Sequence, residues 1–182
     1  MPAQHCEPVI LKRDCEAVAV PEGVDVPIPK GTAVTITQAL GGSFTVHVWG
    51  RMFRIAGTDA DALGKEKPVI PELAPEATHE DVEALAWAQM KTCYDPEIPV
   101  NIVDLGLVYE CCVEQSDGDT RRINVKMTLT EPSCGMGDVL AEDVKSRLRL
   151  IPTVETVEVD LVFDPPWTPE RMSEVARLET GL

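Results

Sequence analysis

The stretch "LVYECCVEQSDGDTRRINVKMTLTEPSCGMGDVLAEDVKSRL" (residues 107–148) contains the pattern that decides the fold. Apolar and polar residues alternate in two runs, and a polar segment with an Asp-Gly pair separates them. Alternation with a period of two is typical of half-buried strands, and Asp-Gly is a strong turn signal. The sequence therefore predicts an antiparallel β-hairpin. On the first strand, one face is expected to carry Leu107, Tyr109, Cys111 and Val113, and the other Val108, Glu110 and Cys112. On the second strand, the residues expected to face inward are Ile123, Val125, Met127 and Leu129.

Helical signals surround this hairpin. Apolar residues recur at i, i+4 spacing from Met136 to Leu148, and Pro152 ends the pattern. An earlier apolar stripe from Val82 to Cys93 follows Thr78, a natural N-cap whose partner in an approximate capping box is Asp81.

The remaining elements complete the expected C-terminal domain. Residues 157–163 alternate like a third strand, and a last helix is expected with Thr168 as its cap, Pro169 at its first position and Gly181 at its end. The predicted order is helix, strand, strand, helix, strand, helix. Helices packed on one face of a three-stranded sheet make an α-β-β-α-β-α two-layer domain of the α+β class.

The N-terminal part has a different pattern. Residues 8–56 read as short strands separated by Gly- and Pro-containing turns, which predicts a small barrel or sandwich. Residues 57–77 contain three prolines and no clear periodicity, which is typical of a semi-rigid linker. We therefore expect a small all-β domain over 1–56, a linker over 57–77 and the α+β domain over 78–182.

Composition excludes several classes of partner. The 182 residues include 31 acidic and 16 basic ones, giving a net charge of −15, which repels nucleic acid and anionic membrane surfaces. No apolar stretch has the length of a membrane span, and the N-terminus has no pattern of an export signal, so a cytoplasmic protein with six reduced cysteines is expected. The cysteines form no CxxC pair, and the three histidines lack finger-like spacing. A structural zinc site is therefore not expected.

Cys134 lies where the second hairpin strand should end and a helix should begin. Gly135 and Gly137 would let the backbone approach a ligand, and a helix N-terminus lowers the pKa of a nearby thiol. A thiolate attacks electrophiles and binds soft metals. The alternative is that Cys134 is only a small residue in a strand-to-helix turn.

Carboxylates form a second group of candidates. Asp95 and Glu97 flank Pro96, and Asp104 precedes Gly106. Simple turn chemistry and solvated charges are the alternative explanation. If the end of one helix, this loop and the strand-to-helix turn meet at one edge of the sheet, a thiolate would lie beside oxygen ligands. We expect Asp95 and Glu97 to be exposed and to matter more to function than to stability.

Two separated motifs, "DPEIPVNIVDLGLVYE" and "MTLTEPSCGMG", resemble the metal–sulfur cluster biosynthesis domain family, and the match extends from Thr78 to the C-terminus. The N-terminal half is similar to the extra domain of the SufT-like branch. Gly135 follows the motif cysteine, as in that branch, whereas many relatives have proline there. The resemblance implies these functional residues: Asp95, Pro96, Glu97, Pro99, Asp104, Gly106, Cys134 and Gly135.

The function implied by the resemblance is maturation of iron–sulfur proteins by assembly, carriage or targeting of clusters. It implies a transient or shared iron–sulfur cluster, with Cys134, Asp95 and Glu97 as candidate metal ligands. The implied partners are the assembly machinery, client apoproteins and a second copy in a homodimer. A single cysteine cannot hold a cluster alone. Two chains could share a cluster, glutathione or a client could complete the ligands, or no cluster is held.

Two other functions stay open at this point. A metal-free adaptor would dock clients to the assembly machinery, with Cys134 only shaping its turn. A cysteine-dependent enzyme is less favoured, because His79 is the single histidine of the second domain and has no partner signature.

Overall fold

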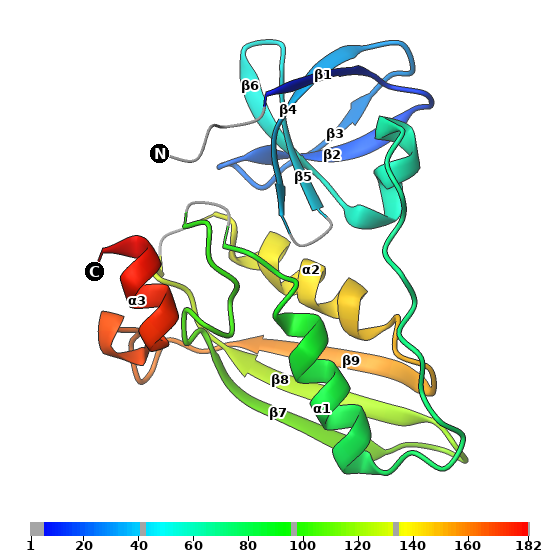
Figure 1. Cartoon of the computed structure of the whole chain (residues 1–182), viewed down its shortest axis with the longest axis vertical. Helices are drawn as coiled ribbons and strands as arrows, with labels where there is room; N and C mark the ends of the chain where they lie inside the picture. Colours follow the sequence, from blue (N-terminus) through cyan, green and yellow to red (C-terminus); the bar gives the residue numbers. More distant parts are fainter. Residues whose placement is uncertain (1–5, 41–42, 96–97, 133–134, 182) are drawn as a thin grey trace. The chain divides into compact units, whose positions relative to one another are not determined.

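The computed structural model describes residues 6–40, 43–95, 98–132 and 135–181. The chain forms two compact units, Met1–Val69 and Ile70–Leu182 (Figure 1). Each unit has a hydrophobic core of its own. Helices and strands occur in both, and the predicted α+β class is confirmed.

The N-terminal unit is built on one six-stranded antiparallel sheet with the strand order β1-β4-β5-β6-β2-β3. Its strands are β1 (Glu7–Ile10), β2 (Cys15–Val20), β3 (Asp25–Ile28), β4 (Ala33–Leu40), β5 (Ser43–Val48) and β6 (Arg51–Ile55). Alternate residues of these strands face a shared core, in which Ile28, Val46 and Ile55 are fully buried. The strand-rich pattern therefore closes around one hydrophobic interior.

The expected linker differs from the structure at its start. Residues 57–63 form a 3₁₀ helix, η1 (Gly57–Leu63), whose Ala60, Ala62 and Leu63 are buried in the core of the N-terminal unit. The guanidinium of Arg13 donates hydrogen bonds to the carboxylates of Asp61 and Asp59 at 2.8 and 2.7 Å, which ties η1 to the strand region. Small apolar residues can enter a core wherever the chain passes it, and the three prolines occur only after η1.

The C-terminal unit contains a three-stranded sheet, β7-β8-β9, in which β8 pairs antiparallel with β7 and parallel with β9. The helices α1 and α2 pack on β7 and β9 respectively and touch each other, so both cover the same face of the sheet (Figure 1). The elements in chain order are α1 (His79–Met90), β7 (Val108–Gln115), β8 (Arg121–Met127), α2 (Gly137–Leu148), β9 (Val154–Leu161), η2 (Pro169–Arg171) and α3 (Glu174–Thr180).

The start of α1 has the predicted capping box. The hydroxyl of Thr78 accepts a hydrogen bond from the backbone N–H of Asp81, and the carboxylate of Asp81 accepts one from the backbone N–H of Thr78 at 2.8 Å. Val82, Ala86 and Met90 are fully buried along one side of the helix. Cys93, expected on the same stripe, is buried in the turn that follows the helix.

The predicted hairpin is confirmed, with one correction at Tyr109. Cys111 pairs with Val125, and both side chains face the core. A β-bulge between Val108 and Glu110 inserts Tyr109 as an extra residue, so that Tyr109 leaves the face it was expected to share with Cys111. Its hydroxyl instead donates to the carbonyl of Pro165 at 2.8 Å. Period-two alternation cannot locate a bulge, because the residue types on either side still alternate.

The closing segment also differs from the prediction. Thr168 and Pro169 begin the short 3₁₀ helix η2, and α3 starts later with Ser173 as its N-cap. Gly181 ends α3 in the left-handed conformation, as predicted. In Figure 1, α3 lies at one end of the sheet and not on the face that α1 and α2 cover. The expectation of three helices on one face is therefore wrong for the last helix.

None of the helices in the described part of the chain combines the length and the apolar character that crossing a bilayer requires.

Candidate functional site

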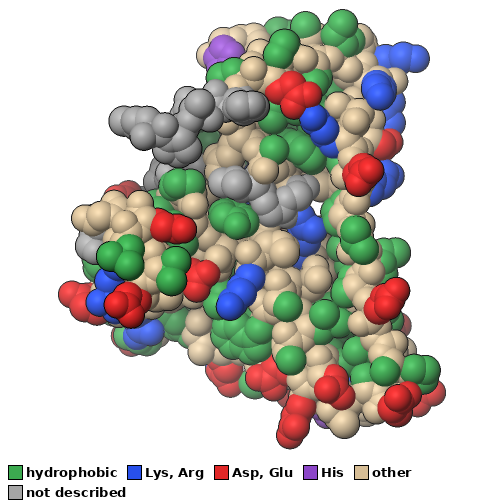
Figure 2. All heavy atoms as spheres, in the orientation of Figure 1, with side chains coloured by type: hydrophobic (Ala, Val, Ile, Leu, Met, Phe, Trp, Pro, Cys, Tyr) green, Lys and Arg blue, Asp and Glu red, His purple; other side chains and the backbone are tan. Residues whose placement is uncertain are grey.

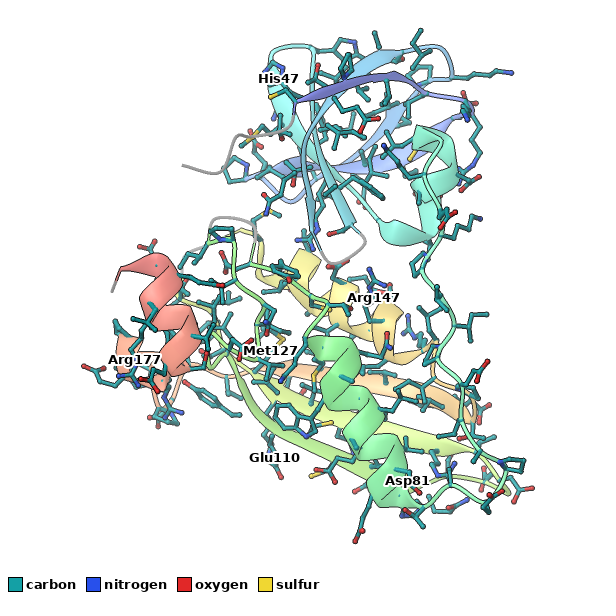
Figure 3. All side chains as sticks on the ribbon, viewed as in Figure 1. His47, Asp81, Glu110, Met127, Arg147 and Arg177 are labelled. Carbon is teal, nitrogen blue, oxygen red and sulfur yellow. The ribbon has the colours of Figure 1, made fainter. Side chains whose placement is uncertain are left out.

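Three connections gather at one end of the C-terminal sheet. β7 begins there while β8 and β9 end there, because Val108 pairs with Met127 and Met127 pairs with Leu161. Figure 3 labels Met127 at this position. The backbone N–H of Thr128 donates to the carbonyl of Leu107 at 2.8 Å, which joins the strand end to the loop before β7. This loop, residues 98–107, is called the site loop below.

Asp95 begins the approach to the site loop, and its side chain is buried, with 6% of its surface exposed. Its Oδ1 accepts a hydrogen bond from the backbone N–H of Ile98 at 2.9 Å, and its own N–H donates to the carbonyl of Val100 at 3.2 Å. The prediction of an exposed Asp95 is therefore wrong. A carboxylate that bonds to the backbone three residues ahead closes a turn, and here the turn folds the carboxylate inward.

Asn101 organises the next part of the site loop. Its side-chain oxygen accepts hydrogen bonds from the backbone N–H groups of Asp104 and Val103 at 2.9 and 3.1 Å. Its amide nitrogen donates to the carboxylate of Asp104 at 2.5 Å. The Asp104 carboxylate is thus part of the loop's own framework. Sequence reasoning missed Asn101, although the spacing "NIVD" is a signal for this kind of side-chain turn.

Gly106 completes the site loop in a conformation that favours glycine, with φ of +72°. Beneath it, Ile102, Leu105 and Leu107 are fully buried in the core that α1 and α2 share with the sheet. Pro99 is exposed. The loop is therefore a shaped, anchored segment with a buried underside and an outer surface that begins at Pro99.

Three sequence-predicted residues, Pro96, Glu97 and Cys134, lie outside the described residues. The described neighbours of Cys134 are Pro132 and Gly135, and both are exposed. Of the predicted metal ligands Cys134, Asp95 and Glu97, the structure thus describes Asp95 alone. Within the described ranges, no three side chains of His, Cys, Asp or Glu gather closely enough to hold a metal ion.

Gly137, the first residue of α2, has a packing role. A β-carbon placed there would come within 2.8 Å of Leu129 and 3.2 Å of Leu161. Glycine at this position lets α2 begin directly on the ends of β8 and β9. The expectation that Gly137 lets the backbone approach a ligand is therefore corrected, because its space is filled by packing. Gly135, two residues earlier in the chain, is exposed.

The other cysteines of the C-terminal unit have either a buried thiol or a thiol whose pKa is raised. Cys93 and Cys111 are buried, and burial raises the pKa of the Cys111 thiol to about 12. Cys112 is partly exposed on the opposite face of the sheet. Its thiol donates to the carboxylate of Glu110 at 3.3 Å, and this hydrogen bond raises the pKa of Cys112. Cys111 and Cys112 thus point to opposite faces, as adjacent strand residues should.

The outer face of the sheet is polar. Residues from the three strands line a shallow hollow there: Glu110, Cys112, Glu114, Arg122, Asn124, Lys126, Glu158 and Asp160. The cations belong to the central strand β8, and Lys126 pairs with Glu110 at 2.8 Å. In Figure 3, Glu110 points away from α1, and in Figure 2 acidic side chains are spread over the visible surface of the unit. This face is a solvated surface of mixed charge with an excess of carboxylates.

Comparison with known proteins places this geometry in a family. The family model described as "Iron-sulfur cluster assembly protein" matches residues 83–160, which include most of α1, the whole site loop and the hairpin. An Fe-S protein maturation auxiliary factor from Porphyromonas gingivalis is 42% identical over 104 residues, which are 57% of this chain and 91% of that protein. The auxiliary factor SufT from Staphylococcus aureus is 41% identical over 88 residues, 48% of this chain and 96% of that protein.

A solved structure supports the same relationship. The crystal structure of a domain of unknown function from Bacillus anthracis is 35% identical, with a TM-score of 0.51, and the match covers 57% of this chain and 95% of that one. The fold and the site loop thus define a domain of the iron–sulfur cluster assembly class. The chain belongs to this family, in its SufT-like branch.

The comparison also shows that the N-terminal unit is absent from at least one relative. The 88 matched residues are nearly all of the Staphylococcus aureus relative but about half of this chain, so that relative is a much shorter protein. The N-terminal unit is therefore not a feature that all SufT relatives share.

Proposed function

We propose that this protein is a maturation factor for iron–sulfur proteins, which assembles, carries or targets clusters for client apoproteins. The observation that carries the proposal is the match of residues 83–160 to the iron–sulfur cluster assembly model. Within this region the hydrogen bond between Thr128 and Leu107 joins the anchored site loop to the end of β8. The relatives named as maturation auxiliary factors support the same role.

In the proposed mechanism, Cys134 supplies a thiolate, and the site loop supplies a preformed surface that the client contacts. Thiolates are the ligands that iron–sulfur clusters use, and a cluster needs about four of them. A transient cluster would therefore be shared with a second copy of the chain, with glutathione or with a client cysteine. In this scheme the cluster is cargo that passes to the client, and the protein itself catalyses no reaction.

The proposal also names the setting and the partners. The partners are the assembly machinery and client apoproteins, and sharing of a cluster favours a homodimer. Cysteines used as thiols require a reducing compartment, so we place the protein in the cytoplasm. Its net charge of −15 supports the exclusion of nucleic acid and anionic membrane surfaces as partners.

A second candidate function is a metal-free adaptor. It is favoured by the hydrogen bonds of Asp95 and Asp104, whose carboxylates shape the loop. A carboxylate engaged in this way contributes to the form of a docking surface without binding metal.

Anaerobic reconstitution with iron and sulfide separates the two functions. The carrier function predicts cluster absorption and bound iron and sulfide in the wild type, with loss of both in Cys134→Ser. It also predicts that Cys134→Ser fails to mature an iron–sulfur client protein. Full client maturation by Cys134→Ser, with client binding retained in a pulldown, would favour the adaptor.

A further inference from the structure

The segment that follows β9 binds the site loop from outside. The indole Nε1–H of Trp167 donates to the carbonyl of Leu105 at 2.7 Å, and the backbone N–H of Ser173 donates to the carbonyl of Asp104 at 2.8 Å. Residues 165–173 are called the strap below. Two consecutive carbonyls of the site loop thus receive their hydrogen bonds from the strap, more than sixty residues away in the sequence.

Steric contacts reinforce these hydrogen bonds. A β-carbon on Gly106 would overlap the backbone carbonyl of Arg171, so the two backbones are in direct contact. The guanidinium of Arg171 lies 4.4 Å from the centre of the Tyr109 ring, and the Tyr109 hydroxyl donates to Pro165. The bulged residue of β7 and the last residues of the site loop are therefore both held by the strap.

The strap is itself firmly attached. Met172 and Ala176 are buried in the core that also contains the underside of the site loop. The side chain of Arg177, labelled in Figure 3, donates from Nε to the carbonyl of Met172 at 3.2 Å. Because the strap has its own buried anchors, it can fix the position of the site loop that it contacts. A loosely held segment would instead move together with the loop.

We propose that Trp167 and Ser173 are positioning residues, and that the strap sets the place of the site loop relative to the strand leading to Cys134. The inference rests on the proposed function of the site loop in iron–sulfur maturation. None of the strap residues contacts cargo in this proposal. They act through the Asp104 and Leu105 carbonyls, which keep the loop in one arrangement before a client arrives.

Ser173 offers a matched pair of variants. Its φ of −62° suits proline, and Met172 before it has φ of −67° and ψ of 146°, the extended conformation required before proline. Ser173→Pro and Ser173→Ala both remove the hydroxyl that caps α3 at Ala176. Only Ser173→Pro also removes the N–H that donates to Asp104.

Hydrogen exchange measures the first consequence in the full-length protein. We expect the amides of Leu105, Gly106 and Leu107, which close the site loop, to exchange about tenfold faster in Ser173→Pro than in Ser173→Ala, the factor expected for loss of one hydrogen bond. The amides of β8 serve as an internal control and should be equal in the two variants. Equal loop exchange in both variants would overturn the strap's role.

Client maturation measures the second consequence. Ser173→Pro should mature an iron–sulfur client about tenfold more slowly than Ser173→Ala, at equal amounts of folded protein. Faster loop exchange with unchanged maturation would overturn the positioning claim. If the wild type also fails to mature the client, the proposed function is wrong, and the exchange result still decides whether the strap holds the loop.

Trp167→Phe is the second variant, in case Ser173→Pro does not fold. It keeps an aromatic ring but removes the donor to Leu105. Trp87→Phe is its control, because Trp87 packs partly buried on the same core from α1. We expect faster exchange of the site loop and slower maturation in Trp167→Phe than in Trp87→Phe. Equal behaviour of the two variants in both assays would overturn the proposal.

Discussion

The buried carboxylate of Asp95 has a structural role, because it accepts a hydrogen bond from the backbone N–H of Ile98. Asp95→Ala removes the acceptor for the Ile98 N–H, and we expect this to destabilise the protein by about 1–3 kcal/mol. Asp95→Asn keeps a carbonyl oxygen at the same place and should cost much less. Urea unfolding of both variants measures the difference. Equal, near-zero losses would contradict a structural role for the side chain.

The same pair of variants tests the chemistry of Asp95. If the carboxylate acts only through its shape, Asp95→Asn should mature a client normally. If its charge is needed for cargo, Asp95→Asn should be inactive while it remains folded.

The thiols should differ in reactivity because their environments differ. Burial raises the pKa of Cys15 to about 11 and that of Cys111 to about 12, so both stay protonated near neutral pH. We expect limited alkylation at pH 7 to label Cys134 first, because it lies two residues before the N-cap of α2, and Cys6, which is exposed, second. Mass spectrometry of tryptic peptides gives the order. Labelling of any other cysteine before Cys134 would contradict the prediction of a lowered pKa for the Cys134 thiol.

Residue patterns alone predicted part of the site. The motif residues Asp104 and Gly106 do lie in one anchored loop, because turn-forming residue types report local backbone needs. The burial of Asp95 could not be predicted, since Asp before Pro is equally typical of an exposed turn. Nor could the sequence show that Gly137 lies against Leu129, two residues after β8, and Leu161, the last residue of β9.

At the scale of the elements, the contact between the site loop and the strap depends on glycine. Gly106 and Gly118 both have positive φ, but only Gly106 is crowded, while the space beside Gly118 is open. Gly118→Ala should therefore cost about 1 kcal/mol for its backbone conformation. Gly106→Ala should cost about 1–3 kcal/mol more, because its new methyl group overlaps the Arg171 carbonyl. Thermal unfolding of the two variants checks the difference, and equal losses would argue against the tight contact.

The capping box of α1 makes a pH-dependent contribution. Hydrogen bonds from the backbone N–H and the hydroxyl of Thr78 hold the pKa of Asp81 below its usual value. A lowered pKa means that the carboxylate stabilises the folded state above its unfolded pKa, near 4, and that this contribution is lost as pH falls further. Between pH 7 and pH 3 the wild type should lose more thermal stability than Asp81→Asn. Parallel loss in both proteins would exclude this contribution.

Element types were largely predictable, whereas their exact ends were not. The hairpin of residues 107–129 and the helix after Met136 follow from hydrophobic periodicity, which depends on local burial. The bulge at Tyr109 and the late start of α3 depend on contacts with Pro165 and Asp104, far away in the sequence. Such contacts cannot be predicted from local residue patterns, because they join residues that are far apart in the sequence.

At the scale of the whole molecule, each unit has a separate core, so each should fold without the other. We expect a fragment of residues 70–182 to show the circular dichroism and the cooperative unfolding of a folded protein. A fragment that is unfolded while the full chain is folded would show that the units depend on each other.

The N-terminal unit gives a sharper version of this prediction. Residues 1–69 include η1, whose Ala60, Ala62 and Leu63 complete the core, while residues 1–56 lack it. The longer fragment should fold, and the shorter one should be much less stable, because it leaves the apolar surface beneath η1 in water. Equal stability of the two fragments would support the domain boundary at residue 56 that the sequence pattern predicts.

The bulge in β7 has a consequence for how copies of this protein can associate. β7 is an outer strand of its sheet, and a regular outer strand offers a continuous row of backbone groups to a neighbouring molecule. The extra residue at Tyr109 interrupts that row, and in a symmetric antiparallel pairing centred on Cys112 the carboxylate of Glu110 would face that of Glu114 in the other copy. The bulge and the like charges disfavour edge-to-edge pairing of β7 with a second copy, so we expect a homodimer to form through a different surface.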